Sequence, residues 1–346
     1  MNWKVQAAYH ERDLLWGELN FVRSNSFIVD TLLHVLMFLL SIIIVTPVSL
    51  FNIVEPISDE LIKNAPEDSL YAQVAEMLSA FWSPILIALV NVLILPMLVD
   101  LVALIRKKET KSGMQEIILK MNFFYMGLNM VLLPLTGLIT IKEFMNLILE
   151  EEFNLISHIA GNLGNMASFF ATYLMQVTFI SNCIQMFDLP HFIVKNLKKF
   201  VARKQLKKFT DDWFFDLGYY QAYTATIMMM CLMFSVLMPI VTGFASCFFF
   251  FRFYIEKYNM LFVYLQDYES KAILRKSIVP YQIVAVTVFQ LFNYTFITVL
   301  TGNSVYGKVG YGIIGFQLVC VYLVGKIHMF DPTFFMPEPE DHHHEV

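Results

Sequence analysis

Charged residues are scarce in this chain: Asp, Glu, Lys and Arg together make up 15% of its 346 residues. An ordinary soluble domain carries about a quarter charged residues. Hydrophobic residues reach 57%, including 33 Phe, and the mean hydropathy is +0.59. This composition excludes a typical soluble globular domain and predicts a polytopic membrane protein.

Cysteine is also rare. The four cysteines all fall within apolar stretches, at Cys183, Cys231, Cys247 and Cys320. This placement predicts small core residues rather than a disulfide framework or a metal-ligand set. The three consecutive histidines His342–His344 lie in a polar terminus, where such a run is more often compositional than functional. We therefore predict no metal site.

Motifs for enzyme chemistry are absent from the sequence. It contains no Walker loop, dinucleotide-binding fingerprint, HExxH zinc site or nucleophile elbow. Its basic residues also lack the interleaved aromatics on which nucleic-acid bases stack. We therefore expect that the protein is not an enzyme, needs no cofactor and binds no nucleic acid.

Long apolar runs are the dominant feature of the sequence. About 20 apolar residues suffice to cross the hydrocarbon of a bilayer, and such spans must be helical when they show no period-2 alternation. The sixth run is short and carries Arg252 near its end, which leaves open whether it crosses fully. The sequence predicts an all-α, polytopic membrane helical bundle of about eight transmembrane helices, at residues 27–54, 81–105, 117–140, 162–187, 214–240, 241–254, 279–300 and 305–325.

The Lys and Arg residues divide these connections into two sides. All of the 24 except Lys63, Lys142 and Lys308 fall on one side of the predicted membrane. Positively charged loops stay in the cytoplasm. We therefore expect both termini to be cytoplasmic. We also expect the protein to be an integral protein of the plasma membrane.

The most basic connection has two interpretations. It could bind anionic lipids of the inner leaflet, each charge near the surface contributing about 1 kcal/mol. The more common alternative is an ordinary charged loop that only sets orientation. The candidate lipid contacts are Lys195, Lys198, Lys199, Arg203, Lys204, Lys207 and Lys208.

The predicted spans carry uncharged polar residues rather than carboxylates. A transporter coupled to ions or protons more often shows a buried carboxylate at mid-membrane. Asn and Gln favour passive conduction along a neutral polar path, although they also serve as hydrogen-bonding glue between helices. Both roles stay open for each residue.

One long segment, residues 214–264, carries a family resemblance. It resembles the signature of the OSCA-type, hyperosmolality-gated, calcium-permeable channel family, and further matches are Asp13-Leu14-Leu15-Trp16 and Tyr268-Glu269-Ser270. The resemblance covers roughly residues 10–326. The matching signature positions are Gly218, Tyr219, Tyr223, Ser235, Pro239, Lys257, Tyr258, Asn259, Phe262, Val263 and Tyr264.

The resemblance implies a fold similar to that of anoctamins and TMC proteins. It implies a mechanosensitive or osmosensitive channel, in contact with membrane lipids, that passes calcium, potassium and sodium and forms a homodimer with one path per subunit. The pore helices would be the first five spans and the main gate the fourth. By polarity and helix membership, the pore-lining candidates are Asn122, Asn129, Asn165, Gln176, Ser181, Asn182 and Gln185.

The chain departs from the family at its beginning. Family members usually start with three more membrane helices and a large cytosolic domain. We therefore expect residues 1–26 to be the end of such a domain, 27–326 the membrane channel region and 327–346 a disordered cytosolic tail, in a truncated or reduced family member. A lipid scramblase of anoctamin-like fold and a membrane transporter are the alternative functions.

Overall fold

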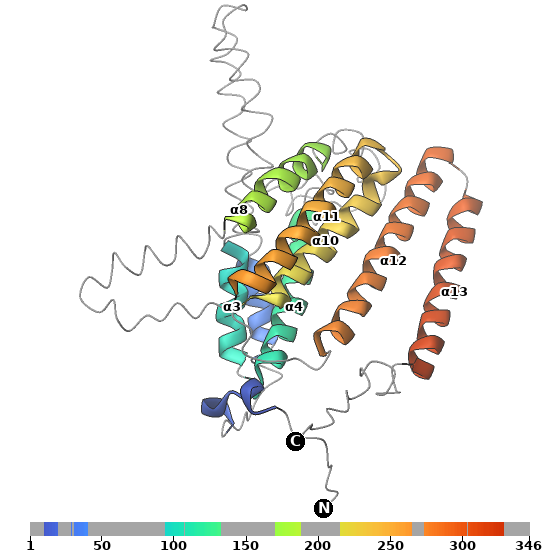
Figure 1. The fold of residues 1–346 in the computed structure, drawn as a ribbon. Coiled ribbons are helices and arrows are strands. Elements are labelled where there is room, and N and C mark those ends of the chain that lie inside the picture. The colour runs from blue at the N-terminus through green and yellow to red at the C-terminus, as the bar shows by residue number, and fades with distance from the viewer. Residues whose placement is uncertain are drawn as a thin grey trace, which may run out of the picture.

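The computed structural model describes residues 10–19, 29, 31–40, 94–106, 108–132, 170–187, 215–264, 273–302 and 304–328. Helices account for almost all of these residues (Figure 1). The one extended pairing among them is an isolated antiparallel bridge between Leu14 and Thr110. The predicted all-α class is confirmed for this part of the chain. The predictions for residues 41–93 and 133–169 lie outside the described residues.

The helices follow one another along the chain. Short π-helical segments extend α4 and α11 at their ends, and a third lies inside the helix of residues 170–187. A further helix covers residues 31–40, and residues 170–187 form one continuous helix, called here the 170–187 helix, of which η5 and α8 are the second half. The named elements are η1 (Glu11–Asp13), η2 (Trp16–Glu18), α3 (Leu95–Arg106), α4 (Lys111–Gly127), η4 (Leu128–Leu132), η5 (Val177–Ser181), α8 (Asn182–Met186), α10 (Leu217–Ser235), α11 (Ile240–Tyr258), η7 (Asn259–Val263), α12 (Ile273–Thr301) and α13 (Ser304–His328).

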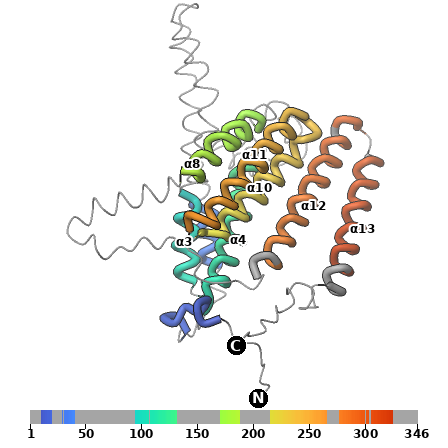
Figure 2. Tube along the Cα trace, in the orientation of Figure 1, coloured from blue at the N-terminus to red at the C-terminus, as the bar shows by residue number. Residues whose placement is uncertain are grey.

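Helix α10 lies at the centre of the bundle. It packs against α4, α11 and α12, while α3 packs on the outer side of α4. Figure 2 shows α12 and α13 as a hairpin at one edge, with α13 resting on α12. The rings of Phe170 and Phe234 stack with centroids 3.9 Å apart, and Phe292 of α12 adds a third ring to Phe234. An aromatic cluster thus joins α10 to the 170–187 helix and to α12.

Gly218 allows α10 and α4 to approach closely. A Cβ atom at this position would overlap the main-chain carbonyl oxygen of Gln115 on α4. The Gln115 side chain accepts a hydrogen bond from the Gly218 amide at 2.7 Å, and Asp216 caps α10 by accepting from the Tyr219 amide. Glycine therefore occupies this family-signature position because no side chain fits there.

The segment before the first helix is fastened to the start of α4. The buried Asp13 carboxylate accepts from the Ser112 amide at 2.9 Å and from the Ser112 hydroxyl at 2.8 Å. The Leu15 amide donates to the Glu109 carbonyl at 2.8 Å. An unpaired amide in the first turn of a helix needs such an acceptor. Asp13 thus acts as a cap for α4 from 99 residues earlier in the chain.

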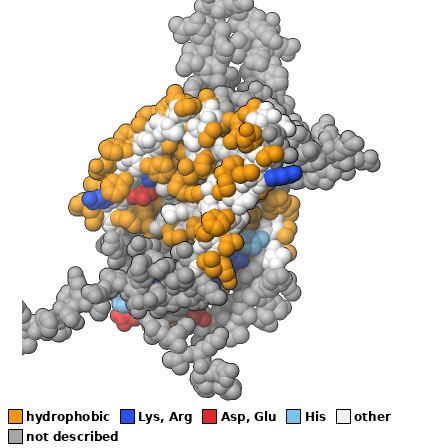
Figure 3. Space-filling view, turned by 90° about the vertical axis from the view of Figure 1, so that its right-hand side faces the viewer, with side chains coloured by type: hydrophobic (Ala, Val, Ile, Leu, Met, Phe, Trp, Pro, Cys, Tyr) orange, Lys and Arg blue, Asp and Glu red, His pale blue; other side chains and the backbone are white. Residues whose placement is uncertain are grey.

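The surface of the bundle is apolar and much of its polar content is inside. In Figure 3, hydrophobic side chains cover most of the described surface in view and charged atoms are few. Exposed positions include Phe250 and Phe253 of α11 and Phe316 of α13, whereas Asn122 and Asn182 are buried. Buried polar groups together with exposed large apolar groups are informative, because a water-soluble protein shows the reverse.

A single described helix, Val305–Leu323 within α13, is both long and apolar enough to cross a membrane by composition alone. The apolar helix Thr31–Leu40 is shorter than a span. Eight spans were predicted from the apolar runs. Polar side chains such as Gln221 in α10 and Asn293 in α12 lower the mean hydropathy of those helices.

Several span boundaries differ from the predictions. Helix α10 ends at Ser235 rather than at residue 240, and α12 begins at Ile273 rather than at residue 279. Helix α4 begins at Lys111 rather than at residue 117, where the apolar run starts. Helix α11 continues past Tyr254 to Tyr258 and on through η7, so the sixth helix is not short. Its 19 α-helical residues alone extend about 28 Å, close to the hydrocarbon thickness. Charged residues ended the predicted run, but the salt bridge between Arg252 and Glu256 lies within the helix.

Replacing Gly218 with alanine should destabilise the bundle. The added methyl group must displace α10 from the α4 backbone, at a cost of about 1–3 kcal/mol for an overpacked contact. The readout is the apparent melting temperature in detergent, followed by size-exclusion chromatography. The matched control is Gly243→Ala on α11, where an added Cβ meets nothing within 4 Å. Equal melting temperatures for the two variants would contradict the close-approach argument.

Replacing Asp13 with alanine should loosen the start of α4. The change removes acceptors from a buried amide and hydroxyl, which costs about 1–3 kcal/mol. Hydrogen exchange of the peptide covering residues 110–116 should therefore accelerate roughly tenfold or more. Glu11→Ala removes an exposed carboxylate from the same 3-10 turn and should leave that exchange rate unchanged. Unaltered exchange in Asp13→Ala would contradict the capping role.

Candidate functional site

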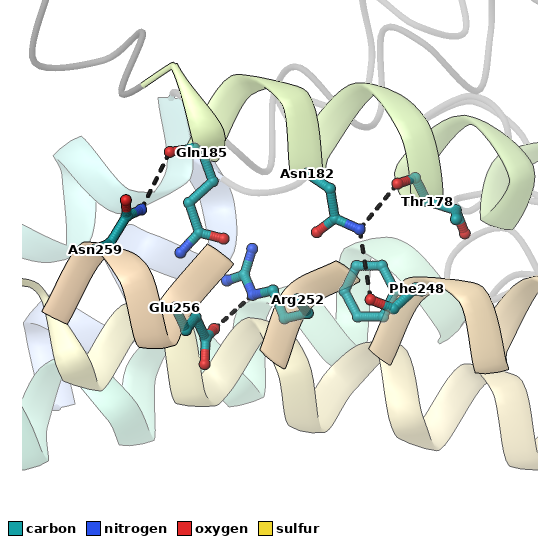
Figure 4. Close-up of polar contacts among 7 residues, drawn as sticks. All are labelled: Thr178, Asn182, Gln185, Phe248, Arg252, Glu256 and Asn259. Carbon is teal, nitrogen blue, oxygen red and sulfur yellow. Dashed lines mark hydrogen bonds and ion pairs between the residues drawn. The ribbon is translucent and has the colours of Figure 1, made fainter. Parts of the chain in front are cut away.

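The 170–187 helix and α11 are joined by side chains that donate to main-chain carbonyls. Thr178 donates to the Leu174 carbonyl of its own helix at 2.7 Å and to the Phe244 carbonyl of α11 at 3.3 Å. Asn182 donates to the Thr178 carbonyl at 2.9 Å and to the Phe248 carbonyl at 3.4 Å (Figure 4). Both bonds to α11 advance by four residues in the same direction, so the two helices run parallel in a fixed register.

Further along this interface a third amide makes a similar contact. The Asn259 side chain donates to the Gln185 main-chain carbonyl at 3.2 Å. The side-chain amide of Gln185 is buried, and neither its nitrogen nor its oxygen has a hydrogen-bond partner among the described residues. The Asn182 side-chain oxygen is also buried without a described hydrogen-bond partner. Three polar atoms at this contact are therefore left for water or another ligand.

Each π-helical segment carries a buried polar side chain. Asn129 lies in η4, Thr178 and Ser181 lie in η5, and Asn259 begins η7. A π-helical turn inserts an extra residue into a helix and occurs frequently at functional sites. The coincidence of all three segments with buried polar groups marks these helix portions as candidates for function.

A buried arginine lies on α11 beside the same contact. The Arg252 side chain is 3% exposed, and its Nε donates to Glu256 Oε1 at 2.5 Å. Its guanidinium carbon lies 4.9 Å from the centre of the Tyr220 ring and 5.5 Å from that of Tyr223, both on α10. These distances fit cation–π contacts. Figure 4 shows the guanidinium between α11 and the Gln185 side chain. We call Asn182, Gln185, Arg252, Glu256 and Asn259 the polar seam.

The predicted pore-lining residues fall into two groups. Gln176, Ser181, Asn182 and Gln185 are buried on the 170–187 helix, next to α11. Asn122 and Asn129 are buried on α4 and η4, which pack against α10. Neither side-chain atom of Asn122 has a partner among the described residues. Asn165 lies outside the described residues, as do the candidate lipid contacts of residues 195–208.

Both roles considered for these amides find support at Asn182. Its nitrogen joins two helices, which is the glue role, while its oxygen stays without a described partner. The main-chain carbonyl of Gln185 accepts a hydrogen bond at this contact, whereas both polar atoms of its side-chain amide have no described partner. The pore role of these residues stays a prediction.

The family-signature residues at the start of α10 are buried in the bundle. Most of those at the end of α11 and in η7 lie at the surface. Gly218, Tyr219 and Tyr223 are buried in α10, Ser235 ends that helix, and Pro239 precedes α11. At the far end of α11 and in η7, two of the signature residues are buried and the others are exposed. Asn259 and Tyr264 are buried, whereas Lys257, Tyr258, Phe262 and Val263 are exposed.

Sequence reasoning missed Arg252 and Glu256 as site residues. Arg252 was interpreted as a sign that the predicted span was about to end, because a charged residue lowers the hydropathy of any segment that contains it. The spacing of four residues between Arg252 and Glu256 was the available signal, since it places opposite charges on one helix face. Thr178 was also missed, and its bond to the Phe244 carbonyl could not be read from its residue type.

An apolar exterior, parallel helices joined through buried amides and unpartnered polar atoms inside the bundle define a helical membrane protein with a polar interior. A family model described as "Calcium-dependent channel, 7TM region" matches residues 25–296. The chain belongs to this family, as its resemblance to OSCA-type channels predicted.

Individual relatives agree with this assignment. The chain is 21% identical over 305 residues to "Osmosensitive cation channel TMEM63C" of Danio rerio, covering 86% of this chain and 36% of that protein. It is 21% identical over 305 residues to "Mechanosensitive cation channel TMEM63B" of Gallus gallus (84% and 35%) and over 276 residues to "Mechanosensitive cation channel TMEM63A" of Mus musculus (76% and 32%). The chain spans about a third of the length of these relatives.

Replacing Asn182 with valine should weaken the joint between the 170–187 helix and α11. The change removes both of its donated hydrogen bonds, and an interhelical bond of this kind contributes about 0.6–2 kcal/mol. The expected result is a lower apparent melting temperature in detergent. Thr242→Val is the matched control, because the exposed Thr242 hydroxyl donates to the carbonyl of Pro239, which directly precedes the same helix. A fall no larger than that of the control would contradict the glue role of Asn182.

Proposed function

We propose that this chain forms the membrane part of a cation channel that responds to mechanical or osmotic stress. Membership of the calcium-dependent channel family supports the class, and the names of the relatives supply the stimulus and the ion. The observation on this chain that supports the proposal best is the set of buried, unpartnered amide atoms at Asn182 and Gln185. Amide oxygens can replace part of the hydration shell of a passing cation.

The proposed path follows the uncharged polar residues of the 170–187 helix. Asn122 and Asn129 of α4 and η4, with Asn165, Gln176, Ser181, Asn182 and Gln185, remain the proposed lining. Calcium, potassium and sodium are the proposed permeating ions. No group of three or more His, Cys, Asp or Glu residues able to hold a metal occurs in the described part of the chain.

The proposed mechanism uses the apolar surface of the bundle as its contact with the bilayer. Membrane tension favours a conformation of larger area in the membrane plane, and it can shift the equilibrium only through the difference between the two conformations. In the proposed open state the 170–187 helix moves relative to its neighbours and water enters the polar seam. We propose a homodimer in the plasma membrane, with both termini in the cytoplasm and with about eight membrane spans.

The test is pressure-clamp recording from membranes in which insertion of this 346-residue chain has been verified. A pressure-evoked current that reverses near the cation equilibrium potential is expected. Gln185→Leu should reduce the single-channel conductance roughly twofold or more, because an apolar side chain replaces the amide in the path.

Gln317→Leu makes the same change on α13, away from the polar seam, and should leave the conductance unchanged. A silent chain despite verified insertion would contradict the channel. Lipid exchange between leaflets without current would instead support the scramblase, and saturable solute uptake would support a transporter.

A further inference from the structure

Arg252 is the one buried cation among the described side chains, and its burial requires compensation. An unpaired charge taken out of water is so costly that buried charges are normally paired. Here Glu256 supplies the opposite charge at 2.5 Å, and the faces of Tyr220 and Tyr223 lie under the guanidinium. The Glu256 side chain is 30% exposed, so this carboxylate joins the buried site to a more accessible surface.

The compensation of Arg252 is incomplete at one atom. Its Nη2 nitrogen is buried and has no hydrogen-bond partner among the described residues. Across the seam lie the unpartnered side-chain nitrogen and oxygen of Gln185 and the unpartnered oxygen of Asn182. Figure 4 shows the Gln185 amide directed toward Arg252. The unpartnered atoms of the seam are therefore two donors, the nitrogens of Arg252 and Gln185, and two acceptors, the oxygens of Gln185 and Asn182.

A mixture of donors and acceptors indicates water rather than a dedicated anion. An anion would satisfy the two nitrogens but would be repelled by the two amide oxygens. Water donates as well as accepts, and buried waters typically make two to four such bonds. The seam is therefore a place where water, and an ion with part of its hydration shell, can contact both Gln185 and Arg252.

We propose that the salt bridge between Arg252 and Glu256 sets the ion selectivity of this seam. The inference rests on the proposed channel function and adds the residues that determine which ions pass. Arg252 alone would repel cations and attract anions, and screening is weak for a buried charge. Glu256 cancels this field, so the neutral amides can act on a cation. Arg252 also links α11 to α10 through its cation–π contacts with Tyr220 and Tyr223.

The experiment compares reversal potentials of pressure-evoked currents from the full chain under a salt gradient across the membrane. Glu256→Gln leaves the arginine charge uncompensated and should lower the cation-to-chloride permeability ratio about tenfold. Arg252→Gln removes the repelling charge instead and should raise that ratio. The double variant Arg252→Gln with Glu256→Gln should return to the wild-type ratio.

The matched control is Glu116→Gln on α4. Glu116 forms a salt bridge with Lys120 at 2.7 Å with the same four-residue spacing, but its cation is 51% exposed whereas Arg252 is 3% exposed. This variant changes the net charge equally and should keep the wild-type reversal potential. A structural role alone would change the amount of current in Glu256→Gln without moving its reversal potential.

The outcomes separate the two proposals. A conducting wild-type chain whose Glu256→Gln variant keeps the wild-type ratio contradicts this inference alone, as does an equal shift in Glu116→Gln. If Glu256→Gln does not reach the membrane, Arg252→Gln decides the question, because an unchanged or lowered ratio contradicts the inference. A silent wild-type chain contradicts the channel function and this inference with it.

Discussion

The absence of water around an apolar bundle is the constraint on which the other features depend. A buried polar group that finds no partner in hydrocarbon costs several kcal/mol, so partners must come from neighbouring helices. Thr178 and Asn182 meet this requirement by donating to carbonyls of α11. Because a carbonyl lies at a fixed place on the helix, these bonds define the register between the two parallel helices.

The same constraint accounts for the charged residues of α11. Arg252 can remain in a helix of this kind because Glu256 lies one turn further on and the α10 tyrosines cover the guanidinium. Counting apolar residues ends the span at residue 254, two residues after this arginine, since the count scores each residue by itself. The helix continues because Arg252 and Glu256 neutralise each other as a pair, so neither charge is buried uncompensated. A charge compensated within its own helix therefore does not end it.

The sequence predicted the features that depend on residue type and missed those that depend on distant partners. Apolar runs gave the all-α class, placed both ends of α13 within three residues and placed the ends of α10 and α12 within six. Polarity selected Asn122, Asn182 and Gln185, which are buried. The cap that Asp13 supplies to Ser112 could not be predicted, because 99 residues separate the two. The π-helical segments were also missed, since they depend on how the helix packs and not on a local pattern.

Hydrogen-bond lengths divide the seam into stronger and weaker parts. Within the 170–187 helix, Thr178 and Asn182 bond to their own helix at 2.7 and 2.9 Å, whereas their bonds to α11 measure 3.3 and 3.4 Å. Hydrogen bonds weaken as they lengthen within this range. The 170–187 helix is therefore joined more firmly to itself than to α11, and water can substitute for the longer bonds at little enthalpic cost. A helix held in this way can separate from its neighbour without unwinding, which is the property that the proposed tension-responsive path requires.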